Sequence, residues 1–164
     1  MSDLLAYEAN GKRIAREAFY AIACDPARSV AVEACAGAGK TWMLVSRILR
    51  ALLAGAQPHE ILAITFTKKA AGEMRQRLQE WLAEFALATP AELQKALEVR
   101  GCGPNPAPGL TEALAGLYGV VLDAGRPVQV RTFHSWFAAL LRNAPLQVLQ
   151  SLGLPANYDL LEDD

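Results

Sequence analysis

At residues 34–41 the chain reads Ala-Cys-Ala-Gly-Ala-Gly-Lys-Thr, between an apolar run at residues 30–32 and a stretch with helical spacing at residues 42–53. This pattern is typical of a phosphate-binding loop, where consecutive backbone N–H groups and the positive end of the following helix surround an anion. In such a loop Lys40 reaches the β- and γ-phosphates and the Thr41 hydroxyl binds Mg²⁺, which makes these two residues the catalytic candidates. The predicted phosphate site consists of Ala34, Cys35, Ala36, Gly37, Ala38, Gly39, Lys40 and Thr41.

The first position of this loop departs from the strict pattern, because Ala34 stands where the pattern has glycine. The chain must therefore turn there without the positive φ that glycine allows. The alternative interpretation is a turn of small residues between a strand and a helix, with Lys40 simply solvated. The register of the two glycines with Lys40 and Thr41 favours the phosphate-binding interpretation.

Length and composition indicate one compact domain or part of a larger one. The chain has 164 residues, of which 52% are hydrophobic and 20% are charged, and these proportions exclude a disordered tail protein. The net charge of −1 gives no global basic field of the kind that attracts nucleic acid. A polyanion site must therefore be local, and a local excess of positive charge does occur at Lys68, Lys69, Arg75 and Arg77.

Cellular location is predicted from two features. The apolar runs are interrupted well before the roughly 20 residues that cross a bilayer, and the N-terminus lacks the basic start of a secretory signal. We therefore expect a cytoplasmic protein without a membrane partner.

Cys24, Cys35 and Cys102 have neither paired nor metal-ligand spacing, so we expect reduced thiols and interpret Cys35 as a small residue that fills the loop.

Strand and helix patterns alternate along most of the chain, which predicts an α/β fold with a parallel sheet flanked by helices. Residues 88–126 interrupt this alternation with a short helix that begins at Thr89-Pro90 and ends near Arg100, a Pro/Gly-rich connector and another helix. They are interpreted as a short helical insertion, and no element is predicted for residues 155–164. The predicted helices are 9–23, 41–53, 68–86, 110–122 and 133–142, and the predicted strands are 29–33, 61–65 and 127–131.

Two further motifs follow predicted strands. Residues 65–74 read Thr-Phe-Thr-Lys-Lys-Ala-Ala-Gly-Glu-Met and residues 132–136 read Thr-Phe-His-Ser-Trp. The carboxyl ends of parallel strands form the ligand-binding edge of an open sheet, so both motifs should lie at that edge. Their hydroxyl and amide groups suit phosphates and their rings suit stacked bases, which indicates single-stranded nucleic acid. The alternative is that Phe66, Phe133 and Trp136 pack in the core and that His134 is a structural histidine.

In this order the three segments resemble motifs I, Ia and Ib of the UvrD/RecB-like superfamily 1 DNA helicases, and most closely those of AddA- and RecB-type repair helicase-nucleases. The resemblance implies a partial RecA-like domain over residues 1–87 and 127–164, with residues 88–126 as a shortened 1B-like insertion. It implies ATP and Mg²⁺ as cofactors at the first motif. It also implies single-stranded DNA as the partner of Thr65, Phe66, Thr67, Thr132, Phe133 and His134.

Other parts of the family pattern are not found in this sequence. Many members place a glutamine before motif I to recognise adenine, and residues 11–19 contain none. No Asp-Glu motif II follows the third segment, and Asp123 is rejected as a substitute because Ala124 follows it. The resemblance therefore implies that the rest of a helicase chain supplies motif II and a second RecA-like domain, and that a further partner is a nuclease or helicase subunit.

Three functions follow from these observations. The preferred one is the N-terminal, ATP-binding and DNA-contacting part of a helicase, which alone would hydrolyse ATP poorly because the acid and the arginine finger are missing. The second is a small-molecule kinase, which would leave the second and third motifs unexplained. The third is a non-catalytic binding module with a vestigial phosphate loop.

Overall fold

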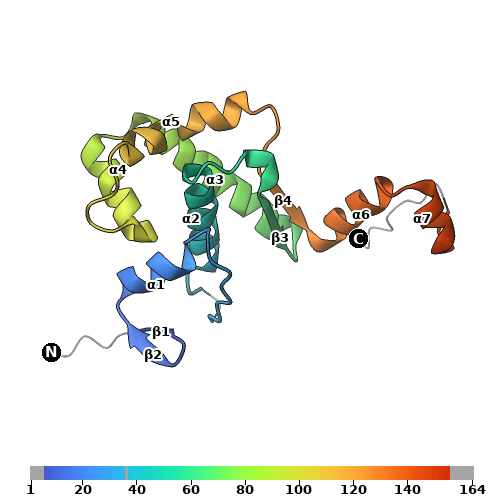
Figure 1. Ribbon diagram of the computed structural model, residues 1–164, viewed down its shortest axis with the longest axis horizontal. Coiled ribbons are helices and arrows are strands. Elements are labelled where there is room, and N and C mark those ends of the chain that lie inside the picture. Colours follow the sequence, from blue (N-terminus) through green and yellow to red (C-terminus); the bar gives the residue numbers. More distant parts are fainter. Residues whose placement is uncertain (1–5, 36, 156–164) are drawn as a thin grey trace.

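The computed structural model describes residues 6–35 and 37–155, and it shows a mainly helical α/β protein (Figure 1). It begins with a hairpin of β1 (Tyr7–Ala9) and β2 (Lys12–Ile14), followed by α1 (Arg16–Ala23). The prediction of one helix over residues 9–23 is therefore wrong in its first half. Asn10 and Gly11 both have positive φ, 51° and 78°, and this is the turn chemistry that closes a two-residue hairpin.

Apart from the strand predicted at residues 29–33, every remaining predicted element is present, with boundaries that differ by a few residues. Helix α7 and the short 3-10 turn η1 were not predicted. The predicted short helix at residues 89–100 is an α-helix followed by a π-helical segment. The elements are α2 (Lys40–Leu53), η1 (Pro58–Glu60), β3 (Leu62–Thr65), α3 (Lys68–Leu87), α4 (Pro90–Leu97), η2 (Glu98–Cys102), α5 (Leu110–Asp123), β4 (Gln129–Thr132), α6 (Phe133–Arg142) and α7 (Leu146–Ser151).

Strands β3 and β4 form a parallel pair with a continuous register from Leu62 opposite Gln129 to Thr65 opposite Thr132. The predicted parallel arrangement is thus present as two strands. The predicted strand at residues 29–33 is wrong, since the structure assigns this segment no strand. A strand needs a neighbour for its N–H and C=O groups, and the described residues provide no neighbouring strand there, which leaves Val30 38% exposed.

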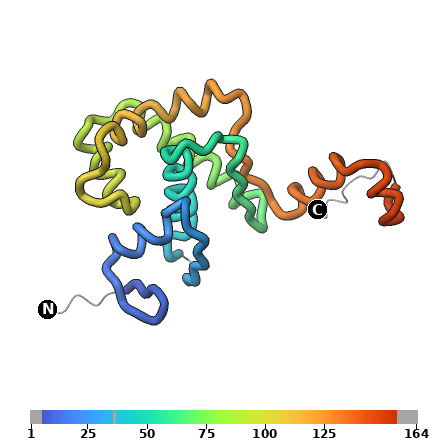
Figure 2. The backbone as a smooth tube through the Cα atoms, viewed as in Figure 1, coloured from blue at the N-terminus to red at the C-terminus, as the bar shows by residue number. Residues whose placement is uncertain are grey.

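The main core lies between α2, α3, α4, α5 and β4. Figure 2 shows the path of the backbone through these elements. Helix α3 contributes Ala71, Met74, Leu78, Leu82 and Phe85, which recur every three or four residues and so lie on one face. Leu49, Leu82, Leu97 and Leu114 are almost completely buried. The helices of residues 88–126 thus share a core with α2 and α3.

Arg100 joins the predicted insertion to α2. Its guanidinium carbon lies 4.3 Å from the ring centroid of Trp81, 5.1 Å from that of Trp42 and 5.0 Å from that of Phe85. Burial lowers the pKa of Arg100 to about 10, so the group is still a cation at neutral pH. Because Trp42 follows the predicted phosphate loop directly, this contact places the insertion against the start of α2.

The α6–α7 segment extends away from the main helical body (Figure 1). Its Phe137, Leu140, Leu146 and Leu152 are largely exposed. In the described part of the chain no helix combines the length and apolar character that a membrane span requires. Ala36 and most of residues 155–164, for which no element was predicted, lie outside the described residues.

Candidate nucleotide and nucleic-acid sites

The predicted phosphate loop leads directly into α2. Gly37 and Gly39 have φ values of 78° and 80°, in the left-handed region where side-chain-bearing residues are strained. Gly39 is the N-cap of α2 and makes no side-chain cap bond, so the first N–H groups of this 14-residue helix are not occupied by a capping residue. The two glycines therefore shape a turn that leaves the start of α2 without a capping side chain, which is the geometry that an anion site requires.

Lys40 lies over this turn. Its Nζ donates hydrogen bonds of 2.9 Å to the Ala34 carbonyl and 2.6 Å to the Cys35 carbonyl. Lys40 is exposed, and it contacts the backbone of its own loop as well as solvent. The ammonium group is thus held at the loop itself, where a phosphate would meet it, while Thr41 is half-buried at the first turn of α2.

Arg47 on α2 holds the segment that leads to the loop. Its Nη1 donates to the carbonyls of Ala23 (3.0 Å) and Asp25 (2.7 Å), and its Nη2 donates to the Arg28 carbonyl. Sequence reasoning missed this residue, because a helical arginine gives no sign of backbone acceptors about 20 positions earlier.

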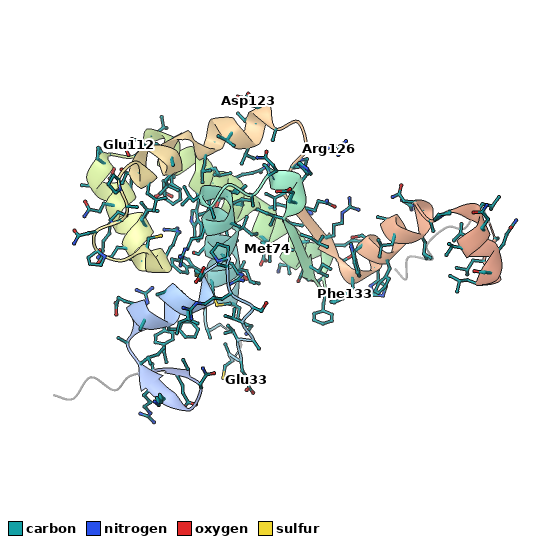
Figure 3. All side chains as sticks on the ribbon, viewed as in Figure 1. Glu33, Met74, Glu112, Asp123, Arg126 and Phe133 are labelled. Atoms are coloured by element: carbon teal, nitrogen blue, oxygen red, sulfur yellow. The ribbon has the colours of Figure 1, made fainter. Side chains whose placement is uncertain are left out.

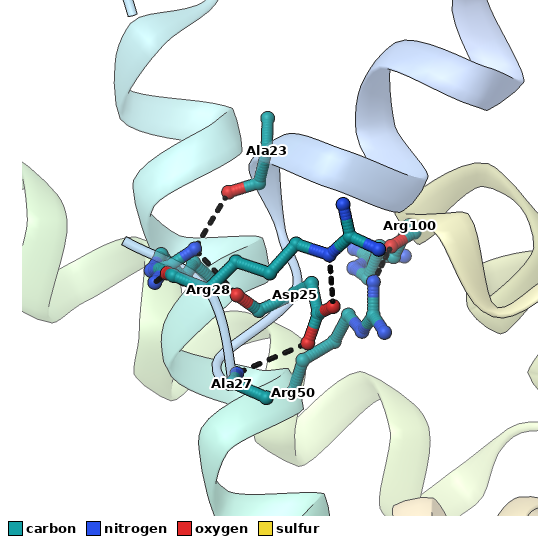
Figure 4. Close-up of polar contacts among 7 residues, drawn as sticks. Ala23, Asp25, Ala27, Arg28, Arg50 and Arg100 are labelled. Atoms are coloured by element: carbon teal, nitrogen blue, oxygen red, sulfur yellow. Dashed lines mark hydrogen bonds and ion pairs between the residues drawn. The ribbon is translucent and has the colours of Figure 1, made fainter. Parts of the chain in front are cut away.

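Asp25 tightens the same segment (Figure 4). Its carboxylate accepts the Ala27 N–H at 3.0 Å and pairs with the Arg28 guanidinium at 3.0 Å. The hydrogen bond from Ala27 is the main cause that lowers the pKa of Asp25. The turn before the loop is therefore fixed from both sides, by Asp25 and by Arg47.

Phe66 and Phe133 lie together at the carboxyl edge of β3 and β4. Their ring centroids are 5.5 Å apart, and Figure 3 shows Phe133 projecting from the end of the sheet. Phe66 is 82% exposed and Phe133 is 39% exposed, so core packing does not explain this pair. The structure thus brings the second and third motifs together, as the parallel-sheet prediction required.

The row of rings continues along α6. Phe137 lies 6.4 Å from Phe133 with an interplanar angle of 25°, and Trp136 lies 4.9 Å from Phe137. Phe137 is 53% exposed. Sequence reasoning missed Phe137, although its position four residues after Phe133 on a helix was a usable signal.

The threonine hydroxyls at this edge serve as helix caps. The Thr67 hydroxyl accepts the Ala70 N–H at 3.1 Å, and the Thr132 hydroxyl accepts the Ser135 N–H at 3.2 Å. Thr132 is only 8% exposed, whereas Thr67 and His134 are exposed and Thr65 is half-buried. Thr132 therefore has a structural part at this edge that the sequence pattern did not reveal.

The four basic residues of α3 that were singled out in the sequence have different surroundings. Arg75 donates from Nη1 to the Val130 carbonyl at 2.8 Å and so connects α3 to β4. Lys68, Lys69 and Arg77 have exposed positions on the same helix. Helix α3 therefore carries exposed cations in addition to Arg75.

Residues 15–162 match the family model described as the UvrD/REP helicase N-terminal domain. The chain is also similar to bacterial proteins whose names describe a subunit of an ATP-dependent helicase/nuclease. The protein from Lactobacillus helveticus is 47% identical over 60 residues, which is 37% of this chain and 5% of that protein. The proteins from Lactobacillus acidophilus and Streptococcus sanguinis are each 42% identical, over 73 residues (44% of this chain, 6% of that protein) and 57 residues (35% and 5%). The chain thus spans about a twentieth of the length of these curated relatives.

Proposed function

Because the chain belongs to the UvrD/REP helicase N-terminal domain family, we propose that it is the ATP-binding and single-stranded-DNA-contacting N-terminal portion of an ATP-dependent DNA helicase. The observation that carries this proposal is the loop of Gly37 and Gly39, with Lys40 held over it at the start of α2. The repair and recombination role, the cytoplasmic location and the nuclease or helicase partner subunit belong to the same proposal. The printed names of the relatives, which describe a subunit of an ATP-dependent helicase/nuclease, support the partner subunit.

The residues of the loop fit a nucleoside triphosphate. Positive φ at two glycines and an uncapped helix start provide backbone N–H groups and a partial positive charge, and Lys40 adds a full charge. Thr41 would hold Mg²⁺ through its hydroxyl. Phosphate oxygens, water and the acidic motif II of a longer helicase chain would supply the other ligands.

These residues bind and position the nucleotide. Hydrolysis in phosphate-loop motors also needs an acidic residue that orients the attacking water and a cation that faces the γ-phosphate. In our proposal both come from the rest of a helicase chain, including a second RecA-like domain and the strand that would neighbour residues 29–33. We therefore expect the 164-residue chain to bind MgATP and to turn it over very slowly.

The Phe66–Phe133 pair would contact single-stranded DNA. An exposed ring pair at the end of two strands offers faces to bases, and the cations of α3 offer charge to phosphates. A small-molecule kinase would leave this ring pair without use. A vestigial loop would not need Lys40 and Thr41 in register with the two glycines.

The first experiment is equilibrium titration of MgATP against Lys40→Ala. We expect affinity to fall at least about tenfold, because a charge-assisted contact to phosphate is removed. Lys69→Ala is the matched control, since it removes an exposed lysine away from the loop. Unchanged affinity of Lys40→Ala would show that the loop does not bind nucleotide phosphates.

The second experiment measures binding of a fluorescent oligothymidylate to Phe66→Ala and Phe133→Ala. Each substitution should cost about 1–3 kcal/mol if a base stacks on the ring, and the salt slope should be about 0.7 per neutralised phosphate. Leu87→Ala is the control, because Leu87 is 90% exposed on the far end of α3. Equal binding by all variants would remove the ring pair from the DNA path and leave the nucleotide assignment intact.

A further inference from the structure

The helical insertion of residues 88–126 sends one buried cation to the start of α2. Helix α4 continues into η2, and Arg100 of η2 is only 6% exposed. Its guanidinium lies over three aromatic rings, and one of them, Trp42, belongs to the first turn of α2. A buried charge is costly without compensation, and here the faces of the rings supply it. Neither the proposed nucleotide site nor the proposed DNA site makes use of this arginine.

We propose that Arg100 is a positioning residue for nucleotide binding, which fixes the first turn of α2 from the insertion, so that nucleotide binding and packing of the insertion strengthen each other. The inference rests on the proposed function, because a nucleotide must bind at the phosphate loop. It goes further by giving the insertion a part in nucleotide binding. Arg100 acts through Trp42 and needs no contact with the nucleotide.

Trp42 connects the arginine to the phosphate site through its backbone. Gly39 is the N-cap of α2, and the Met43 N–H closes the first turn by donating to the Gly39 carbonyl at 3.0 Å. The N–H groups of Lys40, Thr41 and Trp42 precede this bond, so they are the donors that the helix start offers to an anion. An indole ring that is held in place therefore restricts one of these donors directly and the other two through the chain.

The Trp42 ring is held from three directions. The rings of Tyr20 and Trp81 lie 5.0 Å and 5.8 Å from it, centroid to centroid, each with an interplanar angle of 70°. Tyr20 belongs to α1 and Trp81 to α3, whereas Arg100 belongs to the insertion. The guanidinium lies 5.1 Å from the Trp42 centroid and 4.3 Å from that of Trp81, so it joins the two indoles. Removal of the cation therefore loosens the ring from the side of the insertion.

The backbone around Arg100 fits closely against both α1 and α2. Its Nη1 donates to the Ala96 carbonyl at 2.8 Å, and its own carbonyl accepts a bond of 3.4 Å from Arg50 of α2 (Figure 4). Gly101 lies against α1, where a Cβ would come within 2.4 Å of the Ala21 nitrogen. Closely packed elements transmit small displacements, because no free space absorbs them. A shift of the first turn of α2 must therefore be felt in η2.

Thermodynamic linkage makes this coupling measurable from either end. If packing of the insertion raises the affinity for a nucleotide, nucleotide binding must stabilise that packing by the same factor. Coupling between two sites typically changes affinity by about 5- to 150-fold. We therefore expect η2 to respond to a nucleotide that it does not touch.

Isothermal titration with MgATP tests the part of the cation. Arg100→Met keeps an unbranched side chain without the charge and should bind MgATP at least about fivefold more weakly. Arg100→Lys keeps a cation and should recover part of the loss, but not all of it, because an ammonium stacks on rings less well than a guanidinium. Arg126→Met is the matched control, since Arg126 is exposed after α5, and it should bind as the wild type does. An arginine with a purely structural part would change the urea midpoint and leave the affinity of the folded protein unchanged.

Amide hydrogen exchange tests the coupling from the other end. Saturating MgATP should slow exchange in the first turn of α2 and, at least about fivefold, in η2 of the wild type. In Arg100→Met the slowing in α2 should remain and the slowing in η2 should be lost. General stabilisation by a bound ligand would slow η2 in both proteins, so the comparison separates it from coupling.

Three results would overturn the inference. These are equal MgATP affinity of Arg100→Met and the wild type, an Arg100→Lys variant that binds as weakly as Arg100→Met, and exchange in η2 that MgATP does not alter or alters equally in both proteins. If Arg100→Met does not fold, the exchange of η2 in the wild type decides alone. A wild-type chain that does not bind MgATP would remove the proposed function as well, whereas tight binding with an unresponsive η2 would remove only the part of Arg100.

Discussion

Two segments of this chain have the sequence pattern of a strand that leads into a functional motif, and they differ in structure. Residues 61–65 contain β3 (Leu62–Thr65), which pairs with β4 residue by residue. Residues 29–33, here called the approach segment, lead into the phosphate loop and have no partner strand among the described residues. The approach segment instead borders a cavity of about 600 Å³ that Ser29, Val30, Ala31 and Val32 help to line.

The difference teaches that an apolar run specifies a strand only together with a neighbour. Strand propensity largely reflects packing and pairing, and the chain supplies β3 with β4 from almost 70 residues later. The approach segment is held by the Asp25–Arg28 pair and by Arg47, which position the backbone without a ladder of hydrogen bonds.

Amide hydrogen exchange should show the largest contrast between the two segments. The amides of β3 and β4, such as Gln129 N–H donating to the Ile61 carbonyl at 3.0 Å, should exchange about a thousandfold or more slowly than those of the approach segment. In a longer helicase chain that supplies a neighbouring strand, the approach segment should become protected. Equal protection of Val32 and Val130 in the 164-residue chain would contradict the comparison.

The next contrast concerns the small cluster beside the loop, formed by Tyr20, Ala23, Cys24 and Met43. Burial raises the pKa of the Cys24 thiol from 9.0 to about 11. The folded state therefore keeps its proton when the unfolded chain has lost it. The stability that this thiol contributes is complete below pH 9 and is lost as the pH rises through about 11.

We therefore expect Cys24→Ala to lose less stability than the wild type between pH 9 and pH 11. The difference should be on the order of 2 kcal/mol, because the shift of the thiol corresponds to about 1.36 kcal/mol per pKa unit. Urea unfolding of both proteins at several pH values measures this difference. Cys35→Ala is the control, since Cys35 is exposed. Parallel pH profiles of Cys24→Ala and the wild type would show that the cluster does not exclude water from the thiol.

A matched pair of valines compares packing in the two segments. Val130 in β4 is 5% exposed and Val30 in the approach segment is 38% exposed. Val130→Ala should lower the free energy of unfolding by about 1.5 kcal/mol, because two buried methyl groups are lost, and Val30→Ala should lower it by less than about 0.5 kcal/mol. Chemical denaturation gives both values. A cost for Val30→Ala as large as for Val130→Ala would mean that the approach segment is packed in solution.

Features that depend on residues close in sequence were predicted, and contacts between residues distant in sequence were not. Helices were predicted well because their apolar spacing is local, as α3 shows with Ala71, Met74 and Leu78. The loop glycines and the exposed Phe66 lie where their motifs predicted. The hairpin was missed because the helical spacing of residues 14–22 outweighed the Asn10-Gly11 turn signal. Arg47 donates hydrogen bonds to distant backbone carbonyls, and Arg100 lies over distant aromatic rings. No local sequence pattern predicts such contacts.

The smallest expected effect on the free energy of unfolding concerns the N-terminal caps of α2 and α6. Gly39 starts α2 without a side-chain cap, whereas the Thr132 hydroxyl starts α6 by accepting the Ser135 N–H. Thr132→Ala should therefore cost about 1 kcal/mol of unfolding free energy, and Thr132→Ser should recover most of it, because serine caps equally well. Thr111→Ala is the control, since its hydroxyl donates only to the exposed carboxylate of Glu112 among the bonds described. If Thr132→Ala weakens DNA binding without loss of stability, the hydroxyl contacts DNA rather than the helix. If Thr132→Ala lowers both stability and DNA binding, and Thr132→Ser restores both, the cap positions Phe133 at the edge of the sheet.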